Sequence, residues 1–297
     1  MEQTIPHAAT GPIALVGIGS MGRGIAQCLL RGGHELHAYA RRAEAAAPLA
    51  QLGAVAAATP AALGKCRLAI LSLPDADAVR DVLFGPQGLA DALSPGSVVV
   101  DTSTIAATDA REIGQRLGSR GVHMLDAPVS GGQQGAEQGT LGCMVGGEAE
   151  VLDSVRHVLS VFCKSITHAG GPGAGQTVKA CNQVAVTGAM LGMIDALALA
   201  RAQGVDPAVM RDVLLGGTAR SFVLEHRAPK MIAGDFAPGF RARLMRKDLR
   251  IALDTAQAAG VTLGAARMAE RMLDGMCEAG DGDLDWSALA RARTGAA

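Results

Sequence analysis

The pattern of hydrophobic and polar residues changes character near residue 175. Before that point, short and almost continuously apolar runs alternate with segments whose apolar residues recur at helical spacing. Continuous runs of this kind are typical of parallel strands that are covered on both faces. The apolar runs lie at 13–17, 36–39, 68–73, 97–101, 122–126, 141–145 and 165–168. The alternation predicts an α/β fold with a Rossmann-type doubly wound parallel sheet.

After residue 175 the sequence shows no further convincing strand pattern. A long Ala-rich segment at 176–203 is followed by Asp206-Pro207, which combines an N-cap residue with proline at the first helical position. Further helical patterns occupy 220–232, 240–259, 263–278 and 286–293. We therefore expect a flexible N-terminus at residues 1–11, an α/β domain at 12–174 and an all-α C-terminal domain at 175–297.

Length, charge and composition limit the number of domains, the kinds of partner and the make-up of the core. A chain of 297 residues suits two domains, and a net charge of −1 offers no basic field for nucleic acid or an anionic membrane. Apolar residues make up 49% of the chain but aromatic residues only 2%, so the core must be aliphatic. Glycine is abundant, with 39 residues, and the question is where these glycines are used.

Cysteine, histidine and hydropathy patterns indicate a cytoplasmic protein without a metal site. The six cysteines show no C-x-x-C spacing and are expected to be small, reduced core residues. The seven histidines show no metal-ligand spacing. The most apolar stretch, 184–200, is short and is interrupted by Thr187 and Asp195, so we expect a buried helix rather than a membrane span. Residues 1–11 do not resemble a signal peptide.

A glycine-rich loop follows the first apolar run and opens the first helix. It has the form G-x-G-x-x-G, with residues Gly17, Ile18, Gly19, Ser20, Met21 and Gly22. The first glycine permits a tight turn, the second lets the backbone approach a pyrophosphate, and the third lets helix and strand pack closely. The helix N-terminus favours the phosphate charge. In this context the motif predicts a bound dinucleotide; the alternative is a purely structural turn.

The second apolar run indicates which dinucleotide is preferred. An acidic residue that would bind the ribose 2′-hydroxyl of NAD is absent there, and the run is followed by Arg41 and Arg42. Two guanidinium groups can bind a 2′-phosphate through charge-assisted hydrogen bonds. We therefore expect a preference for NADP(H), with NAD(H) possible; the alternative is that both arginines are solvated loop charges.

Two further patterns carry candidate chemistry. Ser130, Gly131 and Gly132 follow another apolar run and offer a hydroxyl and backbone N–H groups to an anion such as a substrate carboxylate. In the long helix, Lys179 shares one face with the residues at i+3 and i+4, which are Asn182 and Gln183. A partly buried lysine can be a general acid or base, although most helical lysines are simply solvated.

Taken together, these motifs resemble the β-hydroxyacid dehydrogenase family, also called the 3-hydroxyisobutyrate dehydrogenase family. The resemblance extends over about residues 12 to 292. The motifs that carry it are Gly17–Gly22, Leu73–Asp75, Asp101–Thr104, Asp126–Gly132, Gly139–Leu141, Gly175–Asn182 and Lys247–Leu249. The resemblance implies an oxidoreductase that transfers a hydride between a nicotinamide cofactor and a small β-hydroxyacid or semialdehyde.

The resemblance also implies roles for individual residues. Lys179 matches the catalytic lysine, and Asn182 matches the residue that orients the substrate or the lysine. The Ser130-Gly131-Gly132 loop matches the loop that binds the substrate carboxylate. The remaining matches are cofactor contacts, at Leu73, Pro74, Thr104 and Lys247, the last accompanied by Asp248. In this family the helical domain completes the cleft and mediates homodimers or homotetramers.

Finer details favour one substrate within the family. Gln183 after Asn182, the segment 235–240 and the tail 283–288 resemble members that reduce tartronate semialdehyde (2-hydroxy-3-oxopropionate) to glycerate. Ala40, Cys143 and Trp286 depart from the pattern of relatives. The alternatives are 3-hydroxyisobutyrate, glyoxylate or succinic semialdehyde as substrate, an imine reductase, which usually lacks the lysine, and a non-catalytic NADP-binding scaffold.

Overall fold

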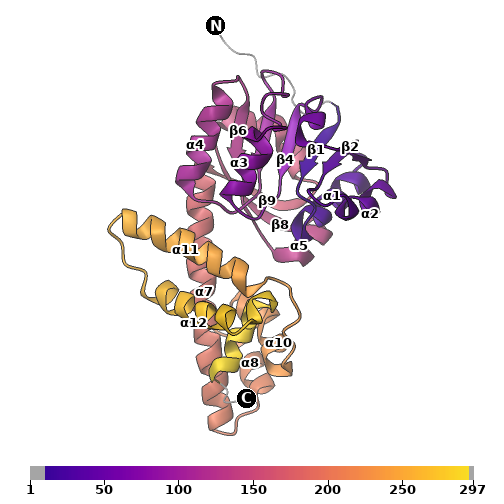
Figure 1. The fold of residues 1–297 in the computed structure, drawn as a ribbon. Helices are drawn as coiled ribbons and strands as arrows, with labels where there is room; N and C mark the ends of the chain where they lie inside the picture. Colours follow the sequence, from indigo (N-terminus) through magenta and orange to yellow (C-terminus); the bar gives the residue numbers. More distant parts are fainter. Residues whose placement is uncertain (1–10, 294–297) are drawn as a thin grey trace. The chain divides into compact units, whose positions relative to one another are not determined.

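The computed structural model describes residues 11–293, which divide into two compact units between Lys179 and Ala180 (Figure 1). The first unit contains a mixed sheet, and the second consists of helices. The fold is therefore a Rossmann-like α/β unit followed by an all-helical unit, as the sequence predicts.

Within the described residues, nine strands form one sheet in the order β3-β2-β1-β4-β5-β6-β8-β7, and β9 pairs with β8. The strands are β1 Ile13–Val16, β2 Leu36–Tyr39, β3 Val55–Ala56, β4 Leu68–Leu71, β5 Val98–Asp101, β6 His123–Asp126, β7 Val129–Ser130, β8 Leu141–Gly146 and β9 Cys163–Gly170. From β3 to β6 all neighbours are parallel. The expectation of a wholly parallel sheet is wrong at one edge, because β8 runs antiparallel to both β6 and β7.

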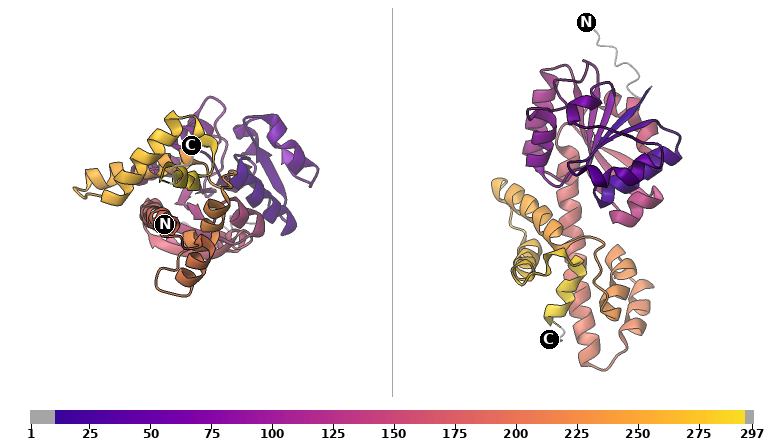
Figure 2. Two further views of the ribbon diagram at one scale, coloured as in Figure 1. Left: turned by 90° about the horizontal axis from the view of Figure 1, so that it is seen from below. Right: turned by 45° about the vertical axis from the view of Figure 1, so that its right-hand side comes forward.

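Helices cover both faces of this sheet (Figure 2). Ile13 and Leu15 of β1 pack in one buried cluster, and Ala14 and Val16 pack in a second cluster on the other face. This two-sided burial explains why β1 and β4 are apolar at every position. The helical elements are α1 Ser20–Arg31, η1 Ala43–Ala45, α2 Ala47–Ala50, η2 Pro60–Leu63, α3 Ala76–Phe84, α4 Ala107–Gly118, α5 Gly132–Gln138 and α6 Ala149–Leu159.

The two helices that follow the glycine-rich motifs, α1 and α5, are in close contact. A Cβ atom on Gly24 of α1 would lie 2.7 Å from the carbonyl carbon of Ala136, so only glycine permits this approach. The Cys28 thiol donates to the Ala136 carbonyl at 3.2 Å, and Arg31 donates to the Glu137 carbonyl at 2.7 Å. The helix after the first glycine loop is thereby fixed to the helix after Gly131.

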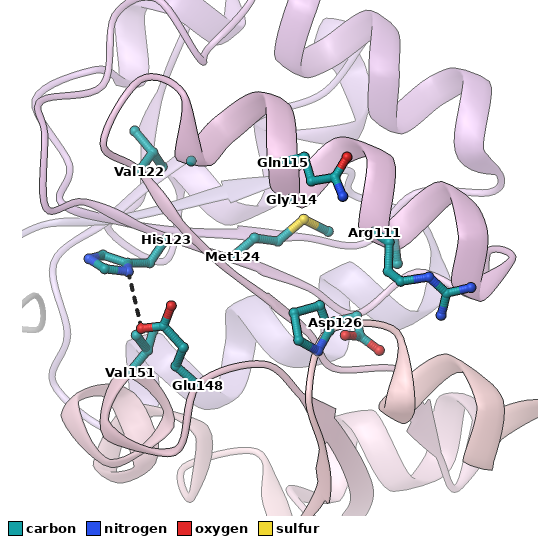
Figure 3. Close-up of a pocket in the computed structure, with 12 residues that line it drawn as sticks. Arg111, Gly114, Gln115, Val122, His123, Met124, Asp126, Glu148 and Val151 are labelled. Atoms are coloured by element: carbon teal, nitrogen blue, oxygen red, sulfur yellow. Dashed lines mark ion pairs between the residues drawn. The ribbon is translucent and has the colours of Figure 1, made fainter.

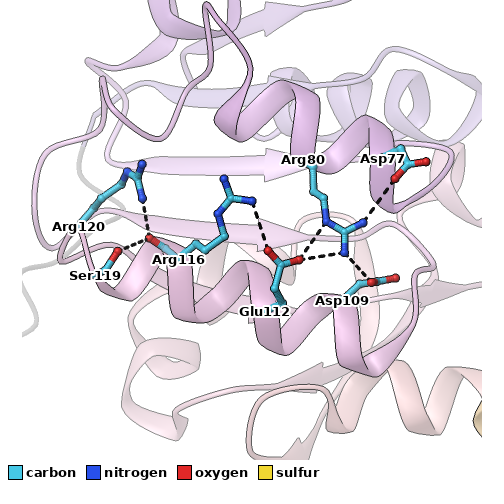
Figure 4. A network of polar contacts seen from close by, with 7 residues as sticks. All are labelled: Asp77, Arg80, Asp109, Glu112, Arg116, Ser119 and Arg120. Carbon is cyan, nitrogen blue, oxygen red and sulfur yellow. Dashed lines mark hydrogen bonds and ion pairs between the residues drawn. The ribbon is translucent and has the colours of Figure 1, made fainter. Parts of the chain in front are cut away.

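Helices α3 and α4 are joined by a surface network of charged side chains (Figure 4). The Arg80 guanidinium donates to Asp109 at 2.6 Å and to Glu112 at 3.0 Å, and it also pairs with Asp77. The hydrogen bond from Arg80 holds the pKa of Glu112 below its ordinary value, although partial burial opposes this effect.

The long helix α7, Ala174–Ala202, continues from the first unit into the second. It is long and apolar enough by composition to cross a membrane, with a mean hydropathy of 1.6 over its most apolar window. Met190, Ile194 and Leu197 nevertheless lie in the core of the helical unit. The other elements of this unit are α8 Pro207–Leu215, α9 Phe222–His226, α10 Ala228–Ala233, α11 Ala242–Ala258, α12 Gly264–Glu278, η3 Asp281–Asp283 and η4 Trp286–Arg293.

A buried carboxylate connects three segments of the helical unit. Asp285 is fully buried and accepts hydrogen bonds from Arg227 at 2.6 Å, from the backbone N–H of Phe240 at 2.8 Å and from that of Gly239 at 3.1 Å. Its other oxygen accepts from the N–H of Ser287 at 3.0 Å. The segments 235–240 and 283–288, which suggested a particular substrate from sequence, are therefore joined to each other in the structure.

Several local expectations need correction. Segment 220–232 is two helices rather than one, because α9 ends at His226 and Pro229 lies in the first turn of α10. The glycine-rich stretch after Ser130 forms α5 rather than only a loop. Cys181 is exposed and so is not a core residue.

Candidate active site

The first glycine loop has the geometry that a dinucleotide needs. Gly17 adopts φ +96°, and a Cβ atom there would overlap the Ser72 carbonyl oxygen. A Cβ on Gly22 would overlap the Gly17 carbonyl oxygen, so the start of α1 lies directly against the loop. A Cβ on Gly19, in contrast, would meet nothing within 4 Å. The open space at Gly19 leaves room for a pyrophosphate, and the close contacts at the other two glycines explain why they must be glycine.

Helix α1 presents free backbone donors beside this open space. Its N-cap is Gly19, and no side chain caps its first turn. Ser20 is exposed and Met21 is half-buried. Ile18, in contrast, is buried in the core that underlies the loop. The uncapped N–H groups at a helix N-terminus are suited to bind a phosphate.

Arg41 and Arg42 lie on the next strand connection. Strand β2 pairs with β1 in parallel register, with Tyr39 opposite Val16. The residues that follow the two strands are therefore neighbours at one edge of the sheet. Both arginines are exposed, and within residues 11–293 neither takes part in an ion pair. Both guanidinium groups therefore face solvent at the same edge of the sheet as the glycine loop.

The remaining candidate cofactor contacts of the first unit follow β4 and β5. Leu73 and Thr104 are half-buried, and Pro74 is exposed. The N–H of Leu73 donates to the Ser103 hydroxyl at 2.9 Å, so the two connections touch. The structure thus brings the candidates after β1, β2, β4 and β5 to the carboxyl edge of the parallel strands, where α/β sheets bind their ligands.

The loop expected to hold a carboxylate lies at the end of β7. Ser130 is half-buried, and the next two residues have positive φ angles, +129° at Gly131 and +64° at Gly132. Successive positive φ values are rare for residues with side chains, which explains the glycine pair. A Cβ on Gly132 would meet nothing within 4 Å, so this side of the loop is open.

Lys179 is joined to that loop. It is only 6% exposed, and its ammonium group donates a hydrogen bond of 2.8 Å to the carbonyl oxygen of Val129, the residue before Ser130. Residues 50 positions apart in the sequence are thereby adjacent. A buried amine one residue from a hydroxyl and two glycine amides can hold or transfer a proton beside a bound carboxylate.

The other candidates belong to the helical unit, where they form a continuous polar chain. The Asn182 amide donates to the Gln183 side-chain oxygen at 2.8 Å, and the Gln183 amide donates to Asp248 at 2.7 Å. Lys247 pairs with the same carboxylate at 3.0 Å. Gln183 and Asp248 are buried, and Asp248 is the hub of this chain.

Sequence reasoning missed three residues that organise the lysine helix: Asp126, Ser103 and Gln176. The Asp126 carboxylate accepts from the N–H groups of Gly173 and Gln176, at 2.7 and 2.9 Å, and so caps α7. Burial raises the pKa of Asp126, although these backbone hydrogen bonds oppose the change. The acidic residue at the end of an apolar run was visible in the sequence, but its distant partner was not.

The structure also has a hollow elsewhere in the first unit, with a volume of about 330 Å³ (Figure 3). It lies beside α4 and β6, and its polar lining includes Arg111, His123 and Glu148, the last two 3.8 Å apart. The sequence-predicted site residues do not line this hollow. Its lining includes Asp126, which caps the lysine helix, but neither Lys179 nor the glycine loop.

Comparison with known proteins agrees with this geometry. Residues 12–171 match the family model of the NAD-binding domain of 6-phosphogluconate dehydrogenase. Residues 173–293 match that of the NAD-binding domain of NADP-dependent 3-hydroxyisobutyrate dehydrogenase. The chain belongs to the β-hydroxyacid dehydrogenase family. It is an NAD(P)-dependent oxidoreductase.

Curated relatives and a solved structure cover almost the whole chain. The chain is 36% identical to 2-hydroxy-3-oxopropionate reductase of Escherichia coli, over 94% of this chain and 96% of that protein. It is also 36% identical to 3-hydroxyisobutyrate dehydrogenase of Pseudomonas aeruginosa, over 93% of this chain and 96% of that protein. A crystal structure of 3-hydroxyisobutyrate dehydrogenase from Salmonella typhimurium superposes with a TM-score of 0.86 at 34% identity, covering 95% of this chain and 99% of that one.

Proposed function

We propose that this protein reduces a small carboxylate-bearing semialdehyde, tartronate semialdehyde (2-hydroxy-3-oxopropionate), to the hydroxyacid glycerate, with NADPH as the preferred cofactor. The observation that carries the proposal is the buried ammonium group of Lys179, hydrogen-bonded to the residue before the Ser130-Gly131-Gly132 loop. This arrangement places a proton donor beside an anion-binding loop. Reduction of a carboxylate-bearing semialdehyde needs both of them in addition to the hydride.

Each residue of this site has a chemical task. The nicotinamide, when bound, supplies the hydride that the carbonyl carbon accepts. Lys179, as an ammonium, donates a proton to the developing alkoxide, and in the oxidative direction the neutral amine accepts it. The Ser130 hydroxyl and the amides of Gly131 and Gly132 bind the carboxylate. Asn182, one helical turn after Lys179 on the continuous helix α7, orients the substrate.

The cofactor-binding residues are proposed on the same basis. Gly17 to Gly22 and the N-terminus of α1 hold the pyrophosphate. The space beside Gly19, where a Cβ would meet nothing within 4 Å, leaves room for it. Leu73, Pro74 and Thr104 contribute further cofactor contacts, and Lys247 contributes near the nicotinamide from the helical unit. We therefore propose residues 12–174 as the dinucleotide-binding domain, which also carries the Ser130 loop, and residues 175–297 as the helical substrate and dimerisation domain.

The test of the catalytic assignment is Lys179→Ala. Loss of a general acid lowers kcat by about 10²–10⁴-fold, and we expect NADPH affinity, measured by fluorescence titration, to stay nearly unchanged. Lys164→Ala is the matched control, because Lys164 is an exposed lysine of the same unit. Retention of full activity by Lys179→Ala would remove the lysine from the mechanism.

The proposed NADPH preference rests on Arg41 and Arg42, which are exposed and follow β2. Replacing both with alanine removes charge-assisted hydrogen bonds worth about 1.5–3 kcal/mol each. We therefore expect KM for NADPH to rise by at least about tenfold while KM for NADH changes little. A wild-type enzyme with the lower KM for NADH would contradict this preference.

Substrate choice is tested with a panel of semialdehydes and β-hydroxyacids. The proposal favours tartronate semialdehyde because Gln183 and the segments 235–240 and 283–288 resemble enzymes of that specificity. Relatives named for 2-hydroxy-3-oxopropionate and for 3-hydroxyisobutyrate are equally identical to this chain, so overall identity does not separate them. If tartronate semialdehyde ranks among the poorest substrates, the substrate assignment fails while the family assignment stands.

We also propose a cytoplasmic homodimer or homotetramer. Its support is the exposed apolar surface of the helical unit, where Leu199 is 65%, Val209 57% and Val213 69% exposed. A Cβ on Gly192 of α7 would meet nothing within 4 Å among the described residues, so this glycine does not serve close helix packing within the chain. Light scattering after size-exclusion chromatography tests the assembly, and a monomer at micromolar concentration would contradict it.

A further inference from the structure

The side chain of Gln176 joins the lysine helix to the loop that follows β5. Gln176 is 2% exposed and lies in the first turns of α7. Its Oε1 accepts from the N–H of Ile105 at 3.2 Å, and its Nε2 donates to the carbonyl oxygen of Ser103 at 2.8 Å. These two residues flank Thr104, which is a proposed cofactor contact. One amide side chain therefore fixes the backbone on both sides of Thr104.

The connection continues to the loop that follows β4. The Ser103 hydroxyl accepts from the N–H of Leu73 at 2.9 Å, and the Ser103 N–H in turn donates to Asp101 at 3.0 Å. Ser103 is 3% exposed and Asp101 is fully buried. Leu73 is a second proposed cofactor contact. Gln176 is thus linked, through Ser103, to both cofactor loops.

The other end of the connection reaches Lys179. The backbone N–H of Gln176 donates to the Asp126 carboxylate at 2.9 Å, which fixes the first turn of α7. Lys179 follows three residues later, so the two side chains project from the same side of the helix. Its ammonium group donates to Val129 at 2.8 Å. All of these contacts lie within the first unit.

Capping of the helix does not explain the Gln176 side chain. The carboxylate of Asp126 already accepts from the N–H groups of Gly173 and Gln176. A buried amide side chain carries a desolvation cost unless both of its ends are hydrogen-bonded, and here both partners belong to a single loop. An apolar residue would fill the same space without specifying where that loop lies.

We propose that Gln176 is a positioning residue, which holds Lys179 in register with the cofactor loops through its two hydrogen bonds to Ser103 and Ile105. The proposal rests on the proposed role of Lys179 as the proton donor. In this role the side chain of Gln176 affects the reaction rate only through the position of Lys179 relative to Leu73 and Thr104.

The test is a double-mutant cycle between Gln176→Met and Lys179→Ala. Methionine is unbranched and of similar length but makes neither hydrogen bond. A misplacement of about 1 Å can lower a rate by about 10²-fold, so we expect Gln176→Met alone to lower kcat by about 10- to 100-fold. In the Lys179→Ala background the same substitution should change the residual rate by less than about twofold, because the group that it positions is gone.

Two controls keep the result decisive. Thr102→Val removes the hydrogen bond of 2.6 Å from the Thr102 hydroxyl to the Leu71 carbonyl, which involves neither Gln176 nor Lys179, and should leave kcat unchanged. Gln176→Glu keeps the acceptor for Ile105 and, when ionised, loses the donor to Ser103. If Gln176→Met does not fold, the cycle is run with Gln176→Glu, whose single-mutant kcat should lie between those of wild type and Gln176→Met.

The outcomes separate this inference from the proposed function. If Lys179→Ala keeps full activity, the proposed function itself fails. If Lys179→Ala is impaired but the Gln176 substitution lowers the rate by the same factor in both backgrounds, only the positioning role is overturned.

Discussion

Replacing Asp285 with alanine removes the carboxylate that joins α10, the segment before α11 and the C-terminal tail. Asp285 is fully buried and accepts four hydrogen bonds, one from the Arg227 guanidinium and three from backbone N–H groups. Arg227 is itself only 16% exposed in its side chain. The substitution therefore leaves a nearly buried charge without its partner.

The expected loss follows from these contacts. Breaking a buried ion pair by removing one partner costs about 3–5 kcal/mol. The N–H groups of Gly239 and Phe240 are half-buried and can regain some hydration, so we expect the lower end, about 3 kcal/mol. That loss corresponds to a change of more than about 100-fold in the unfolding equilibrium. It is a large part of the roughly 5–15 kcal/mol by which folded proteins are stable.

The assay is urea unfolding followed by far-ultraviolet circular dichroism. Asp283→Ala is the matched control, because Asp283 lies two residues earlier, is 65% exposed in its side chain and pairs with the surface residues Arg241 and Arg243. Exposed pairs contribute about 0–1 kcal/mol, so this variant should unfold close to wild type. If Asp285→Ala costs no more than Asp283→Ala, the carboxylate does not hold these segments together and the reasoning is refuted.

Three further predictions follow from other parts of the chain. Gly19→Ala should leave the unfolding midpoint unchanged, because its Cβ meets open space, but should raise Kd for NADPH by about tenfold or more as a charge-assisted contact is lost; an unchanged Kd contradicts the pyrophosphate assignment. A thiol reagent at pH 8 should label exposed Cys181 rapidly and spare Cys66, since burial raises the pKa of Cys66 to about 11; early labelling of Cys66 would show that this region opens. Because the pKa of Glu112 is lowered by Arg80, their interaction stabilises the fold above the ordinary pKa of 4.5 and is lost as pH falls through the lowered value. Arg80→Met should therefore cost about 1 kcal/mol at pH 7, and the difference from wild type should shrink near pH 3; an equal difference at both pH values contradicts the sign.

The strands and long helices were predictable because their signals are local. Every predicted apolar run before residue 175 overlaps a strand, and burial on both faces explains the continuous runs of β1 and β4. Helix α5 was not predictable in the same way. Its sequence, from Gly132 to Gln138, is glycine-rich and polar, and it is stabilised by contact with α1 rather than by its own propensity.

The residues of the candidate site also differ in whether a local sequence pattern identifies them. Lys179 and the Ser130 loop belong to motifs that can be recognised as short patterns, and the structure places them side by side. The role of Gln176 depends on a partner 73 residues away, and no local pattern identifies that partner. Hydrogen bonds between distant loops become visible only when the fold brings the loops together.

The glycine contact between α1 and α5 has a consequence for redesign of this enzyme. Each of these helices begins at one of the two proposed anion-binding loops, and Gly24 against Ala136 sets how closely they approach. The spacing between the two proposed anion-binding loops is therefore determined by the backbone, at a residue that belongs to neither loop. A larger or smaller substrate has to be accommodated by exchanging side chains around the loops, because the interval between the loops cannot be adjusted without separating the two helices.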